Sequence, residues 1–456
     1  MSITLPPRLV IAGVSSGVGK TTIAAGLMRL LSTRAGLSVG AAKVGPDYID
    51  PGFHRLATGH PSRNLDAFLT GTAALPGIAA RAGAGHDVLV IEGVMGLFDG
   101  ALLEGAPPTS TAAVAKALSA PVVLVADAGR TSTSIAAMAK GYLDYDPGVA
   151  VVGVIVNNVA SPSHAAAVRE ALLAAGIAVF GVVPRDSRLR ISSRHLGLVP
   201  VVERPAEIAE RLDEVATVLA NSLDLGALLE QARRAPKVTV AMPGLPEPVA
   251  RARIGVVGGA AFSFVYPDNL EALEAAGAEV VNLDPLSGAR FPRELDGLYI
   301  PGGFPEVFAA GIAQEKAWRA QLKSLVASGA PTWAECGGLL LLAGSLDGAP
   351  MTGVVPARAV MTDRLTLGYA EARVEHTSPI ATAGSRLFGH EFHYSALEPP
   401  GDGLVLRTRS GTGQGGYLSP TLFASYLHLH LAATPEIAER FVRASEGFRL
   451  LRAQSR

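Results

Sequence analysis

Short runs of Val, Ile, Leu and Ala recur along the first half of the chain without alternation of apolar and polar positions. Four of them are RLVIAGV (8–14), DVLVIEGV (87–94), APVVLVADA (120–128) and VAVVGVIVNNV (149–159). Ala- and Leu-rich stretches of helical period separate them, such as TTIAAGLMRLLSTRAG (21–36). Strands buried on both faces that alternate with helices are typical of a parallel sheet with helices on either side. The first half is therefore predicted to be an α/β domain.

The same pattern starts again further along the chain, in RIGVVGGAAF (253–262), GAEVVNLDPL (277–286), LDGLYIPGG (295–303) and APTWAECGG (330–338). A Pro-rich stretch near 240–252 separates the two halves and is typical of a linker. We therefore predict two α/β domains, residues 1–240 and 250–445. Gly-, Ser- and Thr-rich segments between 351 and 426 predict some antiparallel pairing before the last helix.

Composition limits the function classes. The chain has 456 residues, 49% of them hydrophobic, which is enough for large cores in more than one domain. Its 39 Lys plus Arg and 40 Asp plus Glu give a net charge of −1, so we expect neither nucleic-acid nor membrane binding. A single cysteine, no signal-peptide pattern at the start and no apolar run of membrane-spanning length predict a soluble, cytoplasmic protein.

The segment IAGVSSGVGKTTIAAG (11–26) places a glycine-rich turn between a predicted strand and a predicted helix. In a P-loop, backbone N–H groups and the helix N-terminus wrap a phosphate, a lysine reaches the outer phosphates and a hydroxyl binds magnesium. We assign this nucleotide-binding role to Gly17, Gly19, Lys20, Thr21 and Thr22. The strict spacing requires glycine at Val14, but this chain carries it at Gly13 and so has a variant loop.

Two further stretches, KVGPDYIDPGFH (43–54) and IEGVMGLFDG (91–100), place carboxylates near the ends of predicted buried strands. Buried carboxylates are costly unless they meet a cation, and Mg²⁺ is the natural partner at this edge of a parallel sheet. We assign Thr21, Asp47 and Glu92 to the metal, Lys43 to the nucleotide, and Asp47, Tyr48, Asp50 and Asp99 to the substrate. For each acid, a helix cap or a turn remains the alternative.

Cys336 lies in APTWAECGGLLLLAGS (330–345), a predicted strand, sharp turn and helix. A nucleophile on such an elbow is exposed above the sheet, and small neighbours let backbone N–H groups approach a developing oxyanion. Gly337 follows the cysteine, and Gly303 ends the neighbouring predicted strand in LYIPGGFPE (298–306); we expect both to donate to the oxyanion. His428 and His430 are the candidate bases, on one face if their segment is a strand.

The second domain resembles class I glutamine amidotransferases of the cobyric acid synthase type, which implies a flavodoxin-like fold and a cysteine that releases ammonia from glutamine. In the wider class the triad ends in His-Pro-Glu, whereas this chain has His428-Leu429-His430. The resemblance therefore implies a Cys–His dyad without the triad acid, with His428 as base. The first domain resembles dethiobiotin synthetase and the MinD-like P-loop enzymes, including the G-x₅-G-K-T spacing. Partition ATPases of that branch have a signature lysine where this chain has Ser15.

Seven motifs in order resemble the corrin a,c-diamide synthases across nearly the whole chain: KVGPDYIDPGFH, EGVMGLFDG, SRHLGL, GGFPE, ECGG, GHEFHYS and SYLHLH. The resemblance implies ATP- and Mg²⁺-dependent amidation of the a and c acetate side chains of hydrogenobyrinic or cobyrinic acid. The carboxylate would be activated as an acyl phosphate, and L-glutamine would supply the nitrogen. Cobyric acid synthase, a nickel-tetrapyrrole a,c-diamide synthase and, from another class, a partition-type ATPase switch are the alternatives.

The corrin substrate carries many carboxylates, and the segment PRDSRLRISSRHLGL (184–198) gathers basic residues that suit them. We assign Arg188, Arg194 and His195 to the substrate, with a solvated loop as the alternative. In the P-loop relatives an asparagine at the position of Asn157 contacts adenine, although an Asx turn explains it equally well. GHEFHYS (389–395) is interpreted as a polar interface or substrate motif in preference to a zinc site. The metal content of the corrin, the order of amidation and the oligomeric state, including a homodimer, stay open.

Overall fold

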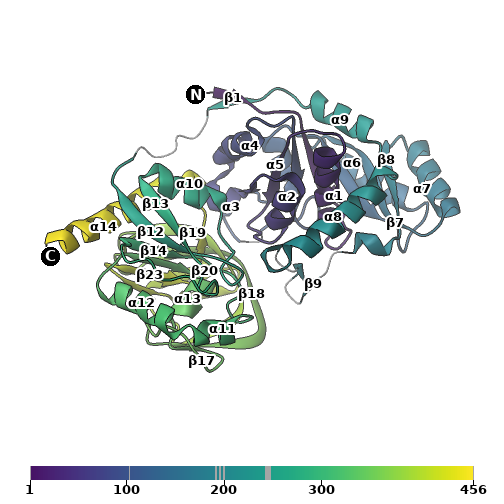
Figure 1. Ribbon diagram of the computed structural model, residues 1–456. Helices are drawn as coiled ribbons and strands as arrows, with labels where there is room; N and C mark the ends of the chain where they lie inside the picture. The colour runs from purple at the N-terminus through teal and green to yellow at the C-terminus, as the bar shows by residue number, and fades with distance from the viewer. Residues whose placement is uncertain are drawn as a thin grey trace. The chain divides into compact units, whose positions relative to one another are not determined.

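The computed structural model describes residues 2–101, 103–190, 193–194, 197–198, 201–241 and 248–454. These residues form two compact units, the first drawn mainly from residues 2–241 and the second mainly from residues 248–454 (Figure 1). Part of the predicted linker, residues 242–247, lies outside the described residues. Within the described part of the chain, no helix combines the length and the apolar character needed to cross a membrane.

The first unit is built on a seven-stranded sheet in which every neighbouring pair of strands is parallel. In spatial order its strands are β4 (Ser62–Leu65), β3 (Val39–Val44), β5 (Val88–Glu92), β2 (Arg8–Gly13), β6 (Val122–Asp127), β7 (Val151–Val159) and β8 (Val179–Pro184). Strands β2 and β5 are buried along their whole length, as their apolar runs predict, and β3 is equally buried although it contains Lys43. The predicted parallel α/β fold is therefore confirmed.

Helices flank this sheet (Figure 1). They are α1 (Lys20–Thr33), α2 (Asp50–Thr58), α4 (Leu75–Gly83), α5 (Thr111–Ala117), α6 (Ile135–Tyr145), α7 (Pro162–Ala174), α8 (Pro205–Ala220) and α9 (Leu225–Arg234). Residues Phe68–Thr70 of the short α3 (Ala67–Thr70) are grouped with the second unit. Helix α1 packs closely on α8 at Gly26, which has no side chain. A Cβ at that position would lie only 2.4 Å from Cγ1 of Val215. The short strands β1 (Ser2–Thr4) and β11 (Thr239–Ala241) pair antiparallel, as do β9 (Ser193–Arg194) and β10 (Gly197–Leu198).

The second unit contains a six-stranded sheet whose first five strands run parallel. In spatial order they are β13 (Ala278–Leu283), β12 (Ala252–Val257), β14 (Gly297–Ile300), β15 (Thr332–Glu335) and β23 (Leu422–Ser425), with β22 (Tyr417–Ser419) antiparallel at the edge. By order of appearance in the chain the five parallel strands stand 2-1-3-4-5, the flavodoxin-like order. The helices are α10 (Pro267–Ala275), α11 (Ala309–Gln314), α12 (Lys316–Ala327), α13 (Gly337–Leu342) and α14 (Pro435–Gln454).

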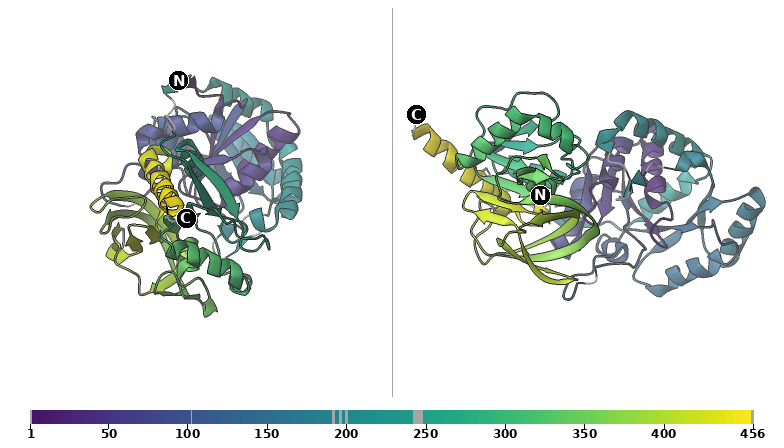
Figure 2. Two further views of the ribbon diagram at one scale, coloured as in Figure 1. Left: turned by 60° about the vertical axis from the view of Figure 1, so that its left-hand side comes forward. Right: turned by 90° about the horizontal axis from the view of Figure 1, so that it is seen from below.

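A second sheet, largely antiparallel, accounts for the segments between residues 345 and 429. It contains β16 (Ser345–Leu346), β17 (Ala349–Pro350), β18 (Arg358–Val374), β19 (Arg386–Glu398), β20 (Leu404–Thr408), β21 (Gly411–Gly415) and β24 (His428–Leu429). The predicted antiparallel pairing is confirmed, but its extent is larger than the sequence indicated: β18 and β19 form one long pair. Helix α14, yellow in Figure 2, projects from this unit at its C-terminal end.

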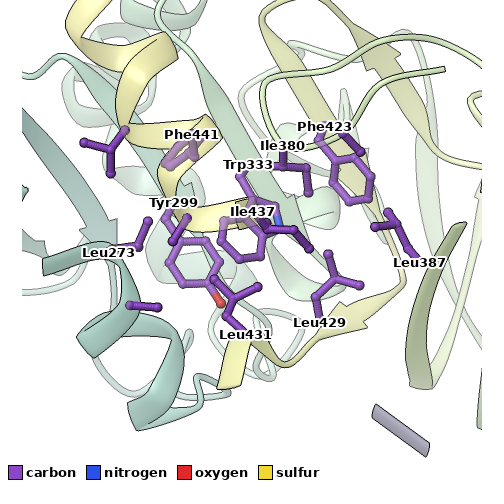
Figure 3. Packing of buried hydrophobic residues seen from close by; sticks show 14 of the residues in the cluster. Leu273, Tyr299, Trp333, Ile380, Leu387, Phe423, Leu429, Leu431, Ile437 and Phe441 are labelled. Carbon is purple, nitrogen blue, oxygen red and sulfur yellow. The ribbon is translucent and has the colours of Figure 1, made fainter. Parts of the chain in front are cut away.

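The parallel sheet of the second unit packs on α14 through an aromatic core (Figure 3). Trp333 is fully buried; its ring stacks on Tyr299 at 4.3 Å between centroids and meets Phe441 edge-on at 6.0 Å. Phe441 belongs to the buried face of α14, whereas Leu450 on the same helix is 50% exposed. The core therefore holds the strand that ends beside the candidate nucleophile.

We expect Phe441→Ala to lower the free energy of unfolding of the second unit by about 3–5 kcal/mol, because it leaves a cavity beside Trp333. The chain's two tryptophans, Trp318 and Trp333, both lie in this unit, so tryptophan fluorescence during urea unfolding reports on it. Leu450→Ala is the matched control on the same helix and should change stability by no more than about 0.5 kcal/mol. Equal losses in the two variants would contradict this account of the core.

Candidate functional site

The predicted glycine-rich turn connects β2 to α1 and contains two glycines in the left-handed region, Gly17 at φ +78° and Gly19 at φ +95°. Residues with a side chain disfavour this region, so the turn depends on glycine at both positions. Lys20 begins α1, and its ammonium donates to the carbonyl of Ser15 at 2.8 Å. A Cβ on Gly13 would lie 2.8 Å from Cδ of Lys20. Glycine at 13 therefore provides the room that the lysine side chain occupies.

Lys20 is a largely buried cation, with 8% of its surface exposed. Burial and then the charge of Lys43 lower the pKa of Lys20 to about 8, although Glu92 and the other nearby carboxylates act in the opposite direction. A buried ammonium that is destabilised in this way gains from an anionic ligand. This supports the predicted contact between Lys20 and phosphate.

A buried cluster of charged groups lies beside the start of α1. The ammonium of Lys43, at the end of β3, is 2.9 Å from Oε1 of Glu92 and 2.7 Å from Oδ2 of Asp50. The hydroxyl of Thr21 donates to Oε1 of Glu92 at 2.6 Å and lies 3.4 Å from Oδ2 of Asp50. Nε2 of His54 is 2.7 Å from Oε2 of Glu92. The structure thus brings together Thr21, Lys43, Asp50 and Glu92, which the sequence predicted separately.

The charge states in this cluster depend on one another. Burial by itself would raise the pKa of Glu92, but Lys43, His54 and Thr21 outweigh it and hold that pKa below its ordinary value. Burial likewise opposes the charge on Lys43, yet Asp50 and Glu92 raise the pKa of the lysine. For Asp50, burial and then the neighbouring carboxylates Asp47 and Glu92 raise the pKa well above its ordinary value. The carboxyl groups of Asp47, Asp50 and Glu92 therefore oppose one another's ionisation, and a further cation among them would relieve that repulsion.

His54 belongs to this cluster although the sequence analysis gave it no role. It is fully buried, and its Nδ1 is 3.0 Å from the hydroxyl of Ser62 while Nε2 meets Glu92. The available signal was its position four residues after Asp50, because residues at this spacing share one face of a helix.

The predicted acids differ in what they contact. Asp47 accepts hydrogen bonds through Oδ1 from the backbone N–H groups of Ile49, at 2.6 Å, and Asp50, at 3.2 Å, so it caps the start of α2. Oδ1 of Asp47 therefore has the helix-capping role that was the alternative to binding a metal or substrate. Tyr48 is half-buried in the same turn. Asp99 accepts from the N–H of Gly96 at 2.8 Å and is exposed.

Thr21, Asp50 and Glu92 together offer the hydroxyl and carboxylate oxygens that Mg²⁺ prefers. Within the described part of the chain, no group of three or more His, Cys, Asp or Glu side chains has the arrangement of a metal site. Magnesium is commonly held by one or two carboxylates, water and the phosphates of a bound nucleotide. These residues therefore fit a magnesium ion that arrives with a nucleotide.

A cavity of about 1050 Å³ opens beside the glycine-rich turn. Its lining includes Thr22 and Asn157, the tentative base-recognition residue. Nδ2 of Asn157 donates to the carbonyl of Val18 at 2.9 Å, and a Cβ on Gly19 would lie 2.3 Å from this nitrogen. Oδ1 of Asn157 is buried and accepts no hydrogen bond from the described residues. Asn157 thus supports the turn through Nδ2.

The basic segment after β8 contributes differently from the prediction. Arg185 and Arg190 line the nucleotide cavity, but Arg188, which we had assigned to the substrate, is exposed and bonded to Asp186 through Nε and Nη2. The guanidinium of Arg188 therefore already has a carboxylate partner. For Arg194 only the backbone is described, as part of a short hairpin. His195 lies outside the described residues.

In the second unit, Cys336 stands on the turn between β15 and α13. Its backbone adopts φ +46° and ψ −103°, a conformation that residues with a side chain rarely take. The turn is held by a hydrogen bond from the N–H of Cys336 to the carbonyl of Ser425 at 2.7 Å, and Sγ lies 3.7 Å from the carbonyl of Phe392. A Cβ on Gly338 would lie 2.1 Å from the carbonyl oxygen of Ile300, so the turn has no room for a larger residue there.

Cys336 is buried, and burial raises the pKa of its thiol, with Glu306 acting in the same direction. A thiol in this environment needs a neighbouring base to become a nucleophile. His428 is placed for that role: a Cβ on Gly302 would lie 2.4 Å from Cε1 of His428, 3.3 Å from its Nε2 and 3.4 Å from Cβ of Cys336. Gly302 therefore lets the imidazole and the thiol approach each other.

The structure separates the two candidate bases. The ring of His430 packs against Tyr266 at 4.4 Å between centroids with the planes tilted by 39°, and its Nε2 lies 3.9 Å from Oδ2 of Asp268. The strand covers residues 428–429, and a 3₁₀-helix begins at Leu431. Of the pair, His428 is the one beside Gly302 and Cys336.

The two glycines predicted to serve the oxyanion lie together. A Cβ on Gly337 would lie 3.0 Å from the backbone nitrogen of Gly303, and a Cβ on Gly303 would lie 2.2 Å from the carbonyl oxygen of Ala261. Only residues without a side chain permit this close approach of three backbone segments. Glycine at both positions therefore brings two buried backbone segments together beside Cys336, where their N–H groups are candidates for contact with an oxyanion.

The motif GHEFHYS lies on β19 beside the same cysteine, a placement that sequence reasoning missed. Nε2 of His390 is 2.9 Å from the hydroxyl of Tyr266, and His393 stacks on Tyr426 at 3.7 Å between ring centroids. Burial raises the pKa of Glu391 to about 7 and lowers that of His393 to about 4. The motif therefore forms one wall of the cysteine site.

Two known domain families match this chain. Residues 9–199 match the CobQ/CobB/MinD/ParA nucleotide binding domain, and residues 253–436 match the CobB/CobQ-like glutamine amidotransferase domain. Each match covers one of the two sites described above.

Several relatives match this chain over nearly their full length. The chain is 45% identical to a hydrogenobyrinate a,c-diamide synthase of Streptomyces coelicolor, with 96% of this chain and 97% of the relative aligned. It is 44% identical to the protein of the same name from Thermobifida fusca, with 96% of each chain aligned. A cobyrinate a,c-diamide synthase of Archaeoglobus fulgidus is 42% identical, with 96% of this chain and 97% of the relative aligned.

We expect Gly19→Ala to weaken nucleotide binding at least about tenfold, because the added Cβ collides with Asn157 and the left-handed backbone is strained by about 1–2 kcal/mol. Titration with a fluorescent ADP analogue measures the change. Gly36→Ala is the matched control, since Gly36 also has a positive φ, +66°, but has open space around its Cβ position. Binding that is equally weak in both variants would show that backbone strain alone, and not the loop, is responsible.

Proposed function

The chain belongs to the family of the hydrogenobyrinate and cobyrinate a,c-diamide synthases, and we propose that it amidates the a and c acetate side chains of a corrin ring with ATP and glutamine. The observation that supports this most directly is the presence of both half-sites in one chain. A P-loop with a buried acidic cluster stands in the first unit, and a cysteine elbow with His428 stands in the second.

Carboxylate amidation requires activation, because an oxide is a very poor leaving group. In the first unit we assign this step to the P-loop, where Lys20 and the backbone N–H groups of the turn would hold the outer phosphates of ATP. Thr21, Asp50 and Glu92 would hold Mg²⁺, which when bound offsets the negative charge of the phosphates. The γ-phosphoryl group passes to the acetate carboxylate, and the resulting acyl phosphate releases phosphate when ammonia attacks.

The second unit would supply the ammonia. The thiol of Cys336 gives its proton to His428, and its sulfur attacks the side-chain amide carbon of glutamine. The backbone amides near Gly303 and Gly337 are placed to stabilise the oxyanion. His428 then returns the proton to the leaving nitrogen, ammonia departs, and water hydrolyses the thioester to glutamate. Ammonia is mostly protonated in neutral water and then has no lone pair, so production within the same protein preserves the nucleophile.

We propose hydrogenobyrinate, the cobalt-free ring, as the preferred corrin, because the two relatives with the higher identities carry that name. The test is incubation with ATP, Mg²⁺ and glutamine, with hydrogenobyrinate and cobyrinate in parallel reactions, followed by mass spectrometry to count the added amides. Two amides on the cobalt-free ring and fewer on the cobalt ring are the expected result. No amide on either ring would refute the proposed function.

We expect Cys336→Ser to abolish amidation with glutamine and to retain amidation with an ammonium salt, because only the release of ammonia depends on the cysteine. Lys20→Ala is the matched variant of the other site: it should abolish product formation with both nitrogen sources, since no acyl phosphate forms. Amide counts by mass spectrometry with each nitrogen source provide the measurement. Undiminished use of glutamine by the serine variant would contradict the role of Cys336.

A further inference from the structure

The histidine segment of this chain has no acid after the base, yet a buried carboxylate approaches His428 from another strand. Glu335 is the last residue of β15, directly before Cys336, and has no exposed surface. Its Oε2 lies 3.6 Å from Nδ1 of His428, and its Oε1 accepts a hydrogen bond from the backbone N–H of Leu429 at 3.2 Å. One carboxylate therefore contacts both the imidazole and the backbone next to it.

Further contacts fix the position of this carboxylate. The hydroxyl of Tyr299 donates to Oε2 of Glu335 at 3.3 Å. Asn269 lies 3.4 Å from the Tyr299 hydroxyl through Nδ2, which also donates to the carbonyl of Leu429 at 2.9 Å. Its Oδ1 accepts from the N–H of Leu431 at 2.8 Å. The network thus connects β15, β14 and α10 to the backbone on the C-terminal side of His428.

Burial makes the ionised carboxylate of Glu335 energetically unfavourable unless other groups compensate its charge. Trp333, two residues earlier in the strand, packs in the aromatic core with Tyr299. Burial raises the pKa of Glu335, and the interactions with His428 and with the N–H of Leu429 act against that rise. A carboxylate in such a place is usually retained because it interacts with a group that becomes positively charged.

The two sides of the His428 imidazole face different groups. Nδ1 faces Glu335, whereas the Cε1–Nε2 edge faces the point beside Gly302 that also contacts Cβ of Cys336. Two further titratable groups near this ring lie on β19: His390, stacked on it at 4.9 Å between centroids, and His393. Neither can carry a negative charge, whereas the carboxylate of Glu335 lies 3.6 Å from Nδ1.

We propose that Glu335 is the positioning residue for His428, in place of the acid that other amidotransferases carry two residues after the histidine. The proposal rests on the glutaminase role inferred above for Cys336 and His428. Glu335 accepts from Nδ1–H and so fixes the tautomer in which Nε2 is free to take the thiol proton. It then stabilises the imidazolium until Nε2 returns the proton to the nitrogen of the departing ammonia.

The strand pairing explains how an acid can act from this position. In the five-strand parallel sheet, β15 and β23 are neighbours, and the chain runs from the end of β23 through Tyr426 and Leu427 directly into β24. The nucleophile and the base thus follow neighbouring strand ends. The residue before the nucleophile is then close enough to contact the base, and no acid is needed in the histidine segment itself.

The decisive experiment measures Glu335→Gln with three readouts: glutamine hydrolysis, amidation driven by an ammonium salt, and alkylation of Cys336 by iodoacetamide. Because Cys336 is the only cysteine, the mass of the intact protein reports its alkylation directly. We expect kcat for glutamine to fall by at least about tenfold with little change in KM, and alkylation to slow by a similar factor. Ammonium-driven amidation should stay within about twofold of wild type, because it depends on the other unit.

Two further variants separate positioning from a purely structural role. Glu335→Asp keeps the charge and should restore part of both the hydrolysis and the alkylation rate. Asp268→Asn is the matched control, since Asp268 is a buried acid that faces His430 instead of His428, and its kcat should stay within about threefold of wild type. An equal loss in the Asp268 variant, or no recovery in the Asp variant, would overturn the proposal.

The outcomes also distinguish the positioning role of Glu335 from the glutaminase function on which it rests. If wild type does not hydrolyse glutamine, the glutaminase role is refuted and the positioning role with it. If wild type hydrolyses glutamine and Glu335→Gln does so equally well, only the positioning role is refuted. Should Glu335→Gln fail to fold, Tyr299→Phe decides: it removes one hydrogen bond to Glu335 and should slow alkylation of Cys336 several-fold, and an unchanged rate overturns the proposal.

Discussion

The cost of placing charge at the end of a buried parallel strand governs both sites of this protein. Glu92 ends β5 and Glu335 ends β15, and neither carboxylate has exposed surface. A charge removed from water in this way must be compensated by nearby cations and hydrogen-bond donors. In the first unit Lys43, His54 and Thr21 provide that compensation, and in the second unit Tyr299 and the Leu429 N–H provide it. Each buried carboxylate is therefore surrounded by polar and charged groups that are also available to take part in a reaction.

Glycines position the reactive groups of the two sites in different ways. In the first, glycines at 17 and 19 shape a turn whose backbone is open to the cavity, and Gly13 leaves space for the lysine. In the second, the glycines remove side chains so that three backbone segments can approach one nucleophile. The strained backbone of Cys336 is tolerated because the core around Trp333 and the bond to Ser425 fix both sides of the turn.

Much of this arrangement was predictable from local pattern. Apolar runs without alternation predicted the parallel strands, and the glycine-rich turn, the cysteine elbow and the acids at strand ends predicted where chemistry gathers. Two assignments did not anticipate a hydrogen bond to a residue close by in the sequence. Arg188 was assigned to the substrate, but Asp186 is bonded to it; Asp47 was assigned to the metal, but one of its oxygens caps α2. In each case a short-range hydrogen bond satisfied a group that the composition alone left available.

The sequence by itself determined the fold class of each unit, and it singled out Cys336 as the candidate nucleophile and the glycine-rich turn as the candidate phosphate-binding loop. These features depend on residues close together in the chain, where periodicity, glycine and the strand-to-helix turn act locally. Only the tertiary structure placed His428, and not His430, beside Gly302 and Cys336, placed GHEFHYS beside Cys336, and brought Glu335 to the imidazole. Those contacts join residues that are far apart in the chain, such as Glu335 and Leu429 at a separation of 94 positions, and they arise because neighbouring strands of one sheet end at the same edge.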